Sequence, residues 1–412
     1  MGGGLLQLVA YGAQDVYLTG NPQITFFKAV YRRHTNFAIE AIQQTFNGSP
    51  GYGNRVTCTI ARNGDLIHRM YLVLDLNSET NSLCKFFGLR LINYVEVEIG
   101  GQKIDKHYSH WMYIWNELSL PASKKQGYYE MIGAKGGVPG TDINKMLYVP
   151  LEFWFCRNVG LALPLISLQY HEVKINLAFE TAKNCKGTST LPTTFGASLW
   201  CDYIFLDTDE RRRFAQLSHE YLIEQLQFTG QEAVNGSSIK PKLNFNHPCK
   251  ELVWFITKKP YDEEYDTNNN WMNYSNGSKI LLADTVDQMV TKLSPSATIS
   301  KNYISNAKLV LNGNDRFSQR NGSYFNLVQP FQHHENIPSN AGINVYSFAL
   351  KPEEHQPSGT LNMSRIDTAV LNISMNNNVD YVTNAGHNFN IYAVNYNVLR
   401  IMSGMGGIAY SN

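Results

Sequence analysis

Charged residues are scarce in this chain of 412 residues, and neither sign prevails. Asp, Glu, Lys and Arg make up 17% of the sequence, and the formal net charge is +1 at pH 7. Globular proteins usually contain roughly 25% charged residues, so we expect much of the surface to be covered, and copies of the same chain can provide that cover. A nearly neutral chain lacks the strongly basic field that collects phosphate groups, so we expect no direct contact with nucleic acid.

Long hydrophobic runs are also missing. No stretch approaches the roughly 18 apolar residues of a membrane-spanning helix. The first apolar stretch, LLQLVA, is too short for a signal peptide and has no basic flank. Leu6 stands where N-myristoylation after Gly2 requires Ser or Thr. These absences predict a soluble protein that is made in the cytoplasm and does not insert directly into a membrane.

Paired cysteine motifs are absent as well. The six cysteines lie at positions 58, 84, 156, 185, 201 and 249, and none of them forms a CxxC pair. A chain of this length can bury a core without disulfide bonds, so the sequence favours free thiols in a reducing compartment.

Motifs for catalysis and metal binding are weak or missing. The sequence contains no GxSxG, Walker A or GxGxxG loop. The adjacent His333 and His334 would point to opposite faces of a strand, and His107 and His110 have no third ligand candidate nearby. We therefore predict surface histidines at 333–334, no metal site, no cofactor, no catalytic residue and no enzymatic activity. Carboxylate pairs of glycosidases are set by spatial arrangement, so the sequence alone leaves that class open.

The N-terminal region has an aromatic and basic stretch, LTGNPQITFFKAVYRRHTNFAIE. Asn21 and Pro22 form a helix start signal, and Ile24, Phe27 and Tyr31 then fall on one helical stripe. From Phe37 the apolar residues alternate, which is typical of a half-buried strand. This pattern predicts a short helix that leads into a strand.

Most of the remaining chain has the pattern of short β-strands separated by Gly, Pro, Asn and Ser, as in β-sandwiches. A helix is expected at 109–120, and the charged stretch DTDERRRFAQLSHE at 207–220 is interpreted as a solvated connector. The predicted strands are 55–61, 70–76, 94–101, 171–180, 197–207, 222–230, 251–257, 307–313, 344–351, 368–375 and 389–402.

A weak internal repeat is present. VEIGGQKI at 97–104 is similar to LVLNGNDRF at 309–317, and EVKINLAF at 172–179 is similar to AVLNISM at 369–375. Two matches in the same order indicate a duplicated sandwich. The longest strand-poor interval, 258–302, is expected to be a surface loop of the second sandwich. Exposed Trp271 and Tyr274 in that loop are the best support for an alternative function, a β-sandwich lectin or glycosidase that stacks sugars on aromatic rings.

One long set of motifs spans nearly the whole chain in order. The motifs are GAQDVYLTGNPQITFFKAVYRRHTNFAIE (12–40), NGDLI (63–67), EIGGQKIDKHY (98–108), YVPLEFWFCRNVGLALPLISLQYHEVKI (148–175), DYIFLDTDERRRFAQLSHEYLIEQLQF (202–228), LNFNHP (243–248), LNGNDRFSQRNGSYFNLVQP (311–330), YSFALKPEEHQPSGTLNMSRID (346–367) and NYNVLRIMSGMGGIAY (395–410). Together these motifs resemble the major capsid proteins of large icosahedral double-stranded DNA viruses of the algal-virus type.

The resemblance implies an all-β fold of two consecutive eight-stranded jelly-roll sandwiches, a double jelly roll, with short helical inserts. The implied parts are an N-terminal arm at 1–24, a first jelly roll at 25–212, and a second jelly roll with the C-terminal tail at 213–412. It also implies a structural function: a homotrimer forms a pseudo-hexameric capsomer that tiles the outer shell. The virion is then the location, and assembly takes place in the host cytoplasm.

The partners implied by the resemblance are further copies in the trimer, neighbouring capsomers, and minor capsid and penton proteins. Residues 1–24 would form an inward-facing assembly arm, with the Ile24, Phe27 and Tyr31 stripe packed beneath the first jelly roll and Arg32 and Arg33 at a polar rim. The resemblance also implies that outer loops can carry glycans, and Asn273 and Asn276 are the candidates here. A minor capsid paralogue is the alternative within the same class.

Overall fold

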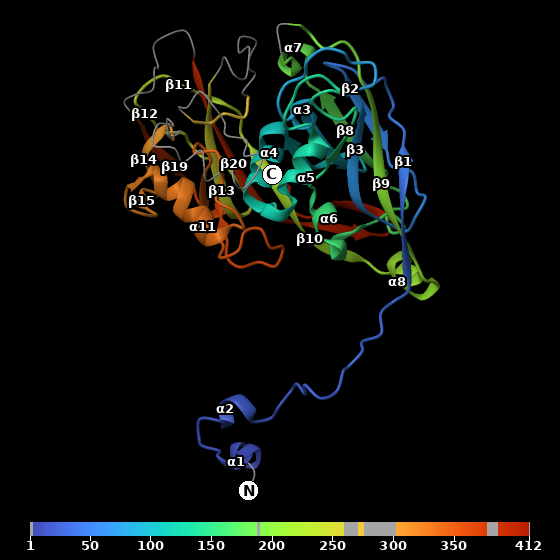
Figure 1. The fold of residues 1–412 in the computed structure, drawn as a ribbon, viewed down its shortest axis with the longest axis vertical. Helices are drawn as coiled ribbons and strands as arrows, with labels where there is room; N and C mark the ends of the chain where they lie inside the picture. The colour runs from blue at the N-terminus through green and yellow to red at the C-terminus, as the bar shows by residue number, and fades with distance from the viewer. Residues whose placement is uncertain (1–2, 188–189, 259–270, 276–301, 377–385, 412) are drawn as a thin grey trace. The chain divides into compact units, whose positions relative to one another are not determined.

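The computed structural model describes residues 3–187, 190–258, 271–275, 302–376 and 386–411 (Figure 1). The chain divides into two compact units, Met1–Asn36 and Phe37–Asn412. No helix among the described residues is both long enough and apolar enough to cross a membrane.

The unit Met1–Asn36 contains two short helices, α1 (Gly3–Val9) and α2 (Val16–Thr19). The helix predicted after Asn21 is wrong, because residues 20–36 form no helix. Asn21 adopts a left-handed φ of 51°, which is not the extended geometry of a helix cap. A short helix needs packing of its apolar stripe to offset the cost of nucleation, and Ile24, Phe27 and Tyr31 are 72%, 96% and 91% exposed.

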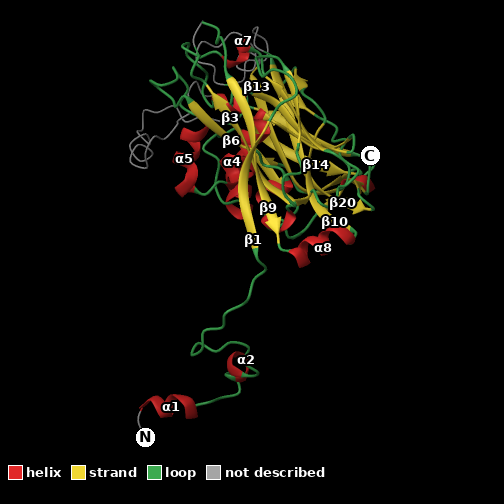
Figure 2. Ribbon diagram, turned by 90° about the vertical axis from the view of Figure 1, so that its right-hand side faces the viewer, coloured by secondary structure: helices red, strands yellow, loops and turns green. Residues whose placement is uncertain are grey.

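The unit Phe37–Asn412 consists mainly of strands, as Figure 2 shows, and these strands pair antiparallel. Its first half forms two sheets whose main paths have the orders β1-β9-β3-β6 and β2-β8-β4-β5. The strands are β1 (Phe37–Gln44), β2 (Arg55–Thr59), β3 (Leu66–Asp75), β4 (Ile92–Ile99), β5 (Gln102–Tyr108), β6 (Met146–Pro150), β7 (Leu163–Pro164), β8 (Val173–Phe179) and β9 (Gly196–Leu206).

The second half repeats this arrangement, with main paths β10-β20-β13-β17 and β12-β19-β14-β15. The fold is therefore two consecutive sandwiches, each with two four-stranded main paths, as predicted. The strands are β10 (His219–Phe228), β11 (Glu232–Val234), β12 (Ser238–Ile239), β13 (Pro248–Lys258), β14 (Ile304–Leu311), β15 (Asn314–Asp315), β16 (Arg320–Asn321), β17 (Asn344–Ser347), β18 (Leu361–Asn362), β19 (Ala369–Met375), β20 (His387–Met402) and β21 (Met405–Ile408).

The internal repeat seen in the sequence is confirmed by strand pairing and turn geometry. β4 pairs with β8, and the equivalent β14 pairs with β19. Both matched motifs turn through two residues with positive φ: Gly100 (57°) and Gly101 (85°) in the first, Asn312 (47°) and Gly313 (81°) in the second. Two-residue hairpin turns favour Gly and Asn at such positions, because these residues tolerate left-handed backbone.

Helices occupy the connections between strands. The predicted helix at 109–120 is α4 (Ser109–Ser119), and the charged connector contains α8 (Thr208–Gln216), which has no buried residue. Asp207 caps α8 by accepting a hydrogen bond from the Thr208 amide. The others are α3 (Phe87–Arg90), α5 (Ala122–Ile132), α6 (Trp154–Arg157), η1 (Val159–Leu161), α7 (Ala182–Cys185), the π-helix η2 (Tyr324–Val328), α11 (Gln329–His333) and η3 (Met363–Arg365).

The two sandwiches share a hydrophobic core. One cluster of buried residues includes the interior of the first sandwich together with Val253, Phe255, Tyr392 and Val394 of the second. Another cluster fills the second sandwich and includes Trp254 of β13. β13 and β20 therefore bury both of their faces, which fits the unbroken apolar stretches at 252–256 in β13 and 391–394 in β20. All six cysteines are buried and free, as the sequence indicated.

Candidate functional site: an exposed apolar face and a buried charged seam

The outer face of the sheet β1-β9-β3-β6 carries a row of partly exposed aromatic side chains. The ring of Tyr71 stacks with that of Trp200 at a centroid distance of 6.4 Å and lies 6.3 Å from that of Tyr148. The register places these residues side by side, because Tyr71 pairs with Trp200 and Val73 with both Ser198 and Tyr148. This face is mainly apolar, with Asp202 and Asp75 among its residues, although it forms no part of the interior of the first sandwich.

The same face continues onto β1, where the sequence predicted a half-buried strand. The strand exists, but Phe37 and Ile39 are 53% and 49% exposed. β1 pairs only with β9 among the described strands, so it lies at a sheet edge. Large exposed apolar patches on soluble proteins usually mark interaction sites.

The equivalent face of the second sandwich is covered by the first sandwich. Tyr392 of β20 packs against Trp111 of α4, with ring centroids 5.6 Å apart. The amide of Leu226 on β10 donates to Asp105 Oδ1 at 2.9 Å, and the side chain of Gln225 hydrogen-bonds to the Ile104 carbonyl. One repeat therefore shows a buried contact at the position where the other repeat shows an exposed apolar face.

The two sandwiches also differ in how far their helical connections are buried. In the first sandwich, α4 follows β5 and is buried along ten of its eleven residues, including Trp111 and Trp115. In the second, η2 and α11 occupy the equivalent connection between β16 and β17, and they leave Leu327, Val328 and Phe331 46%, 39% and 75% exposed. Within one chain, therefore, α4 of the first sandwich is covered by neighbouring residues, whereas η2 and α11 of the second sandwich remain partly exposed.

The seam between the sandwiches also holds a buried charge cluster around Glu224 of β10. Arg157 Nη2 lies 2.7 Å from Glu224 Oε2, while Lys250 Nζ lies 3.0 Å and His355 Nδ1 3.2 Å from Oε1. Burial alone would raise the pKa of Glu224, but Arg157, the hydrogen bond with His355 and Lys250 lower this pKa to about 2. A carboxylate with three cationic or donor partners stays ionised even when it is almost completely removed from water.

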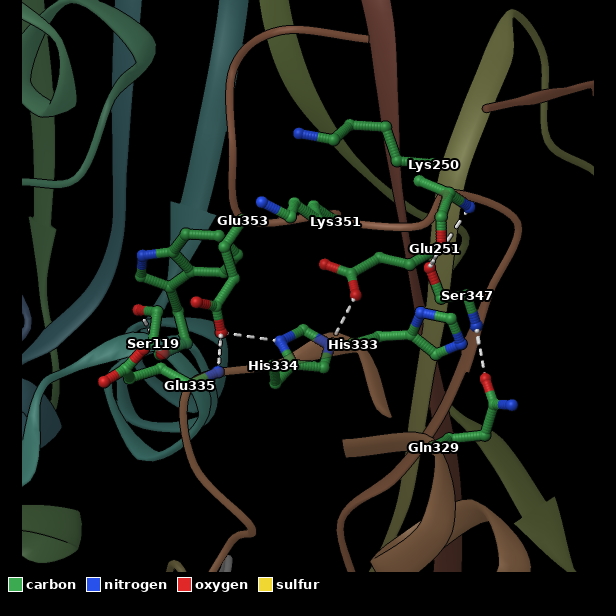
Figure 3. A network of polar contacts seen from close by, with 12 residues as sticks. Ser119, Lys250, Glu251, Gln329, His333, His334, Glu335, Ser347, Lys351 and Glu353 are labelled. Atoms are coloured by element: carbon green, nitrogen blue, oxygen red, sulfur yellow. Dashed lines mark hydrogen bonds and ion pairs between the residues drawn. The ribbon is translucent and has the colours of Figure 1, made fainter. Parts of the chain in front are cut away.

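His334 forms a second buried ionic group next to this cluster. Figure 3 shows its imidazole between two carboxylates, with Nε2 2.9 Å from Glu251 Oε2 and Nδ1 2.8 Å from Glu353 Oε1. Burial lowers the pKa of His334, but the two carboxylates outweigh this and raise it to about 9. The His334 side chain is 0% exposed, so the prediction of a surface histidine is wrong here. His333 ends α11 and His334 adopts extended backbone, which turns the two rings apart.

A cavity of about 390 Å³ lies beside these groups and is lined by residues that include Arg157, Glu224, Glu353 and His355. Arg157 and His355 already pair with Glu224, and Glu353 pairs with His334. Among the described residues, no cluster of three or more His, Cys, Asp or Glu side chains is arranged to hold a metal ion. His107 pairs with Asp105 at 3.0 Å and His110 with the Tyr274 hydroxyl at 2.8 Å, so these two histidines have separate partners.

The described residues 271–275 correct the expectation of an exposed aromatic loop. Trp271 and Tyr274 are 1% and 0% exposed, and the Trp271 indole donates to the Lys85 carbonyl at 2.8 Å. This short segment, which we call the clasp, therefore packs a part of the second half of the chain against the first sandwich. Asn273 is 1% exposed and accepts hydrogen bonds from Ser275, so the expected surface glycan position is wrong for Asn273. Asn276 lies outside the described residues.

The predicted assembly residues all lie in the unit Met1–Asn36. Ile24, Phe27, Tyr31, Arg32 and Arg33 are exposed. Sequence reasoning missed the seam residues Glu224, Lys250 and His334. One signal was available: Lys250 and Glu251 interrupt a run of apolar residues on β13, and charges inside a buried strand are expected to be paired.

Comparison with known proteins agrees with this architecture. Residues 25–207 match the family described as "Major capsid protein N-terminus", and residues 210–407 match "Large eukaryotic DNA virus major capsid protein". The major capsid protein of Pyramimonas orientalis virus is 54% identical, and that of Paramecium bursaria Chlorella virus 1 is 47% identical; both alignments cover 100% of each chain. A chain of a quasi-atomic structure of the PBCV-1 virus capsid matches with a TM-score of 0.77 and 40% identity, covering 94% of this chain and 100% of that one. The Faustovirus major capsid protein shares the fold, with a TM-score of 0.73 at 13% identity.

Proposed function

Because this chain belongs to the major capsid protein family of large eukaryotic DNA viruses, we propose that three copies assemble into a ring-shaped capsomer that repeats the internal contact between the two sandwiches. The chain is a structural protein of the virion capsid, with a double jelly-roll fold. The full-length identity to major capsid proteins favours this function over that of a minor paralogue.

The main observation behind this proposal is that the equivalent outer faces of the two sandwiches differ in burial. The outer face of β10-β20-β13-β17 is buried against the first sandwich, whereas the outer face of β1-β9-β3-β6 presents Tyr71, Tyr148 and Trp200. In a ring, this exposed face packs against η2 and α11 of the next copy, where Phe331 is exposed. Such a head-to-tail contact produces a closed ring when the rotation between copies closes.

The low content of charged residues supports the same assembly. Interface cores are depleted in charged residues and enriched in aromatic side chains. The chain as a whole has the first property, with 17% charged residues, and the outer face of the first sandwich has the second. Three chains with two sandwiches each give six similar units around a three-fold axis, and this nearly hexagonal outline allows neighbouring capsomers to tile a shell.

Substitutions on the two faces test the proposal. Trp200→Glu and Phe331→Glu each place a charge in the proposed contact, so each variant is expected to sediment as a folded monomer. Leu191→Glu is the matched control, since Leu191 is 50% exposed and lies on neither face. Trimers of either face variant would contradict the proposed contact, as would loss of trimers in the control.

The exposed apolar residues of the unit Met1–Asn36 support a further assembly function for residues 1–24. We propose that this arm contacts minor capsid proteins, penton proteins or neighbouring capsomers during assembly in the host cytoplasm. A chain lacking residues 1–24 is expected to form trimers but not shells. Failure of that truncated chain to fold would contradict the arm function.

The carbohydrate-binding alternative loses its support, because its two aromatic residues, Trp271 and Tyr274, form the buried clasp. We therefore do not propose sugar binding.

A further inference from the structure

Two free cysteines of the first sandwich, Cys84 and Cys185, lie opposite each other on neighbouring segments. Leu83 and Lys186 are partners in an antiparallel bridge. The Cys84 amide donates to the Cys185 carbonyl at 3.0 Å, and the Gly187 amide donates to the Ser82 carbonyl at 2.9 Å. These hydrogen bonds place Cys84 opposite Cys185, next to the bridged pair Leu83 and Lys186. Cys185 is also the last residue of α7.

The spacing of such a pair suits a disulfide bond. Opposed Cα atoms of antiparallel segments lie about 4.5–5.5 Å apart, and disulfide-bonded cysteines have Cα separations of about 4.4–6.8 Å. Burial is the main cause of the raised pKa of the Cys185 thiol, but this thiol is also close enough to Cys84 for the Cys84 thiol to raise its pKa further. Cys84 and Cys185 are 1% and 0% exposed and belong to the same core cluster.

We propose that Cys84 and Cys185 form an intramolecular disulfide bond when the folded protein meets a low-molecular-weight disulfide such as oxidised glutathione. One cysteine thiolate attacks a sulfur of the small disulfide, which forms a mixed disulfide and releases one small thiolate. The second cysteine thiolate then displaces the remaining small thiolate. The two cysteines are oxidised, the small disulfide is reduced to two thiols, and the two cysteine protons end on those thiols.

The surroundings of the pair explain why the thiols persist until an oxidant is present. Burial raises the pKa of Cys84 to about 12, although the nearby guanidinium of Arg90 acts in the opposite direction. Burial also raises the pKa of Cys185, and the Cys84 thiol adds to this effect. Thiolate is the reactive form, so exchange is slow, and a bond once formed is equally shielded from reductants.

The other cysteines are arranged differently. Cys58 lies on β2 and Cys201 on β9, in the two facing sheets of the first sandwich, and facing sheets are about 10 Å apart. Cys156 lies on α6 and Cys249 on β13 of the second sandwich. Cys84 and Cys185 are the cysteines that backbone hydrogen bonds hold opposite each other, and their bond would close a loop of about 100 residues, which restricts the unfolded chain.

The test uses the purified full chain and is independent of the assembly proposal. Wild-type protein and the Cys84→Ser, Cys185→Ser and Cys249→Ser variants are incubated with oxidised glutathione in two arms, one folded and one refolding from urea. Intact mass and peptide mapping without reductant then identify the bonds. We expect one Cys84–Cys185 bond in the wild type and in the Cys249→Ser control, and a rise in their Tm of several degrees.

The two serine variants should form glutathione adducts instead and show no such rise in Tm. A Cys84–Cys185 bond in the folded arm supports the proposal. Another pairing, such as Cys156–Cys201, or two free thiols at positions 84 and 185 in the folded arm, even if the bond forms during refolding, would overturn it.

Discussion

The ammonium group of Lys250 lies 3.0 Å from Oε1 of Glu224, and these two side chains are 1% and 3% exposed. They belong to β13 and β10, which lie on either side of β20. Lys250 also donates to the Glu354 carbonyl at 3.0 Å, and Glu224 is held by Arg157. The seam between the sandwiches is therefore fixed by paired charges as well as by apolar packing.

Removal of the Glu224 charge should be costly, because it leaves the buried Lys250 and the partly buried Arg157 without their carboxylate. Glu224→Gln is expected to lower the free energy of unfolding by about 3 kcal/mol, measured by urea denaturation. Glu220→Gln is the control on the same strand, since Glu220 pairs with Arg400 at 2.8 Å but is 60% exposed. Its expected loss is below about 1 kcal/mol, and equal losses in both variants would contradict the account of the seam.

The His334 group predicts loss of stability at alkaline pH. The folded-state pKa of about 9 is above the ordinary value of 6.5, so the stabilisation is fully present below pH 6.5 and disappears as the pH rises through 9. The wild type should therefore lose its advantage over His334→Gln between pH 6.5 and 9, as followed by thermal unfolding. A constant difference between the two proteins across that range would refute the prediction.

Glu224 predicts the opposite behaviour in acid. Its pKa is lowered from 4.5 to about 2, so its stabilisation is complete above pH 4.5 and is lost as the pH falls towards 2. The wild type should lose its advantage over Glu224→Gln in that window, as measured by unfolding at a series of pH values. An advantage that stays unchanged down to pH 2 would show that the ion pairs do not stabilise the fold.

The clasp predicts a large effect at Trp271. Trp271→Ala removes a buried side chain whose ring lies 5.2 Å from the Arg90 guanidinium, and a loss of about 3–5 kcal/mol is expected. Trp271→Phe keeps most of the packing but removes the hydrogen bond to Lys85, so its loss should be clearly smaller. Urea denaturation of both variants measures these losses in the free energy of unfolding. A Trp271→Ala variant as stable as the wild type would mean that the clasp does not hold the two halves together.

Gly342 predicts a steric effect at the other side of the clasp. A Cβ atom at Gly342 would overlap the backbone carbonyl of Tyr274, so Gly342→Ala should destabilise the protein. Gly127 lies inside α5 with nothing within 4 Å of an added Cβ, and Gly127→Ala should stabilise by up to about 1 kcal/mol. The Tm of both variants tests these two predictions. A Gly342→Ala variant with an unchanged Tm would contradict the close approach between Gly342 and the Tyr274 carbonyl.

Most of the longer strands could be predicted from the sequence because local apolar patterns and turn residues determine them, whereas β5, β6 and several two- to four-residue strands were missed. The repeat was visible for the same reason, since Gly101 and Gly313 mark equivalent hairpins. The seam was not predictable, because Glu224, Lys250 and His334 are brought together from distant positions along the chain. The helix after Asn21 and the exposed loop around Trp271 were wrong because local pattern does not show whether a segment finds a packing partner.

Light scattering on the purified full chain tests the central claim most directly. A solution mass near three times 46.7 kDa, reduced to a single chain by Trp200→Glu or Phe331→Glu, is the predicted result. A wild-type chain that stays monomeric and folded over a wide range of concentrations would contradict the claim that its exposed apolar faces close a ring of three copies.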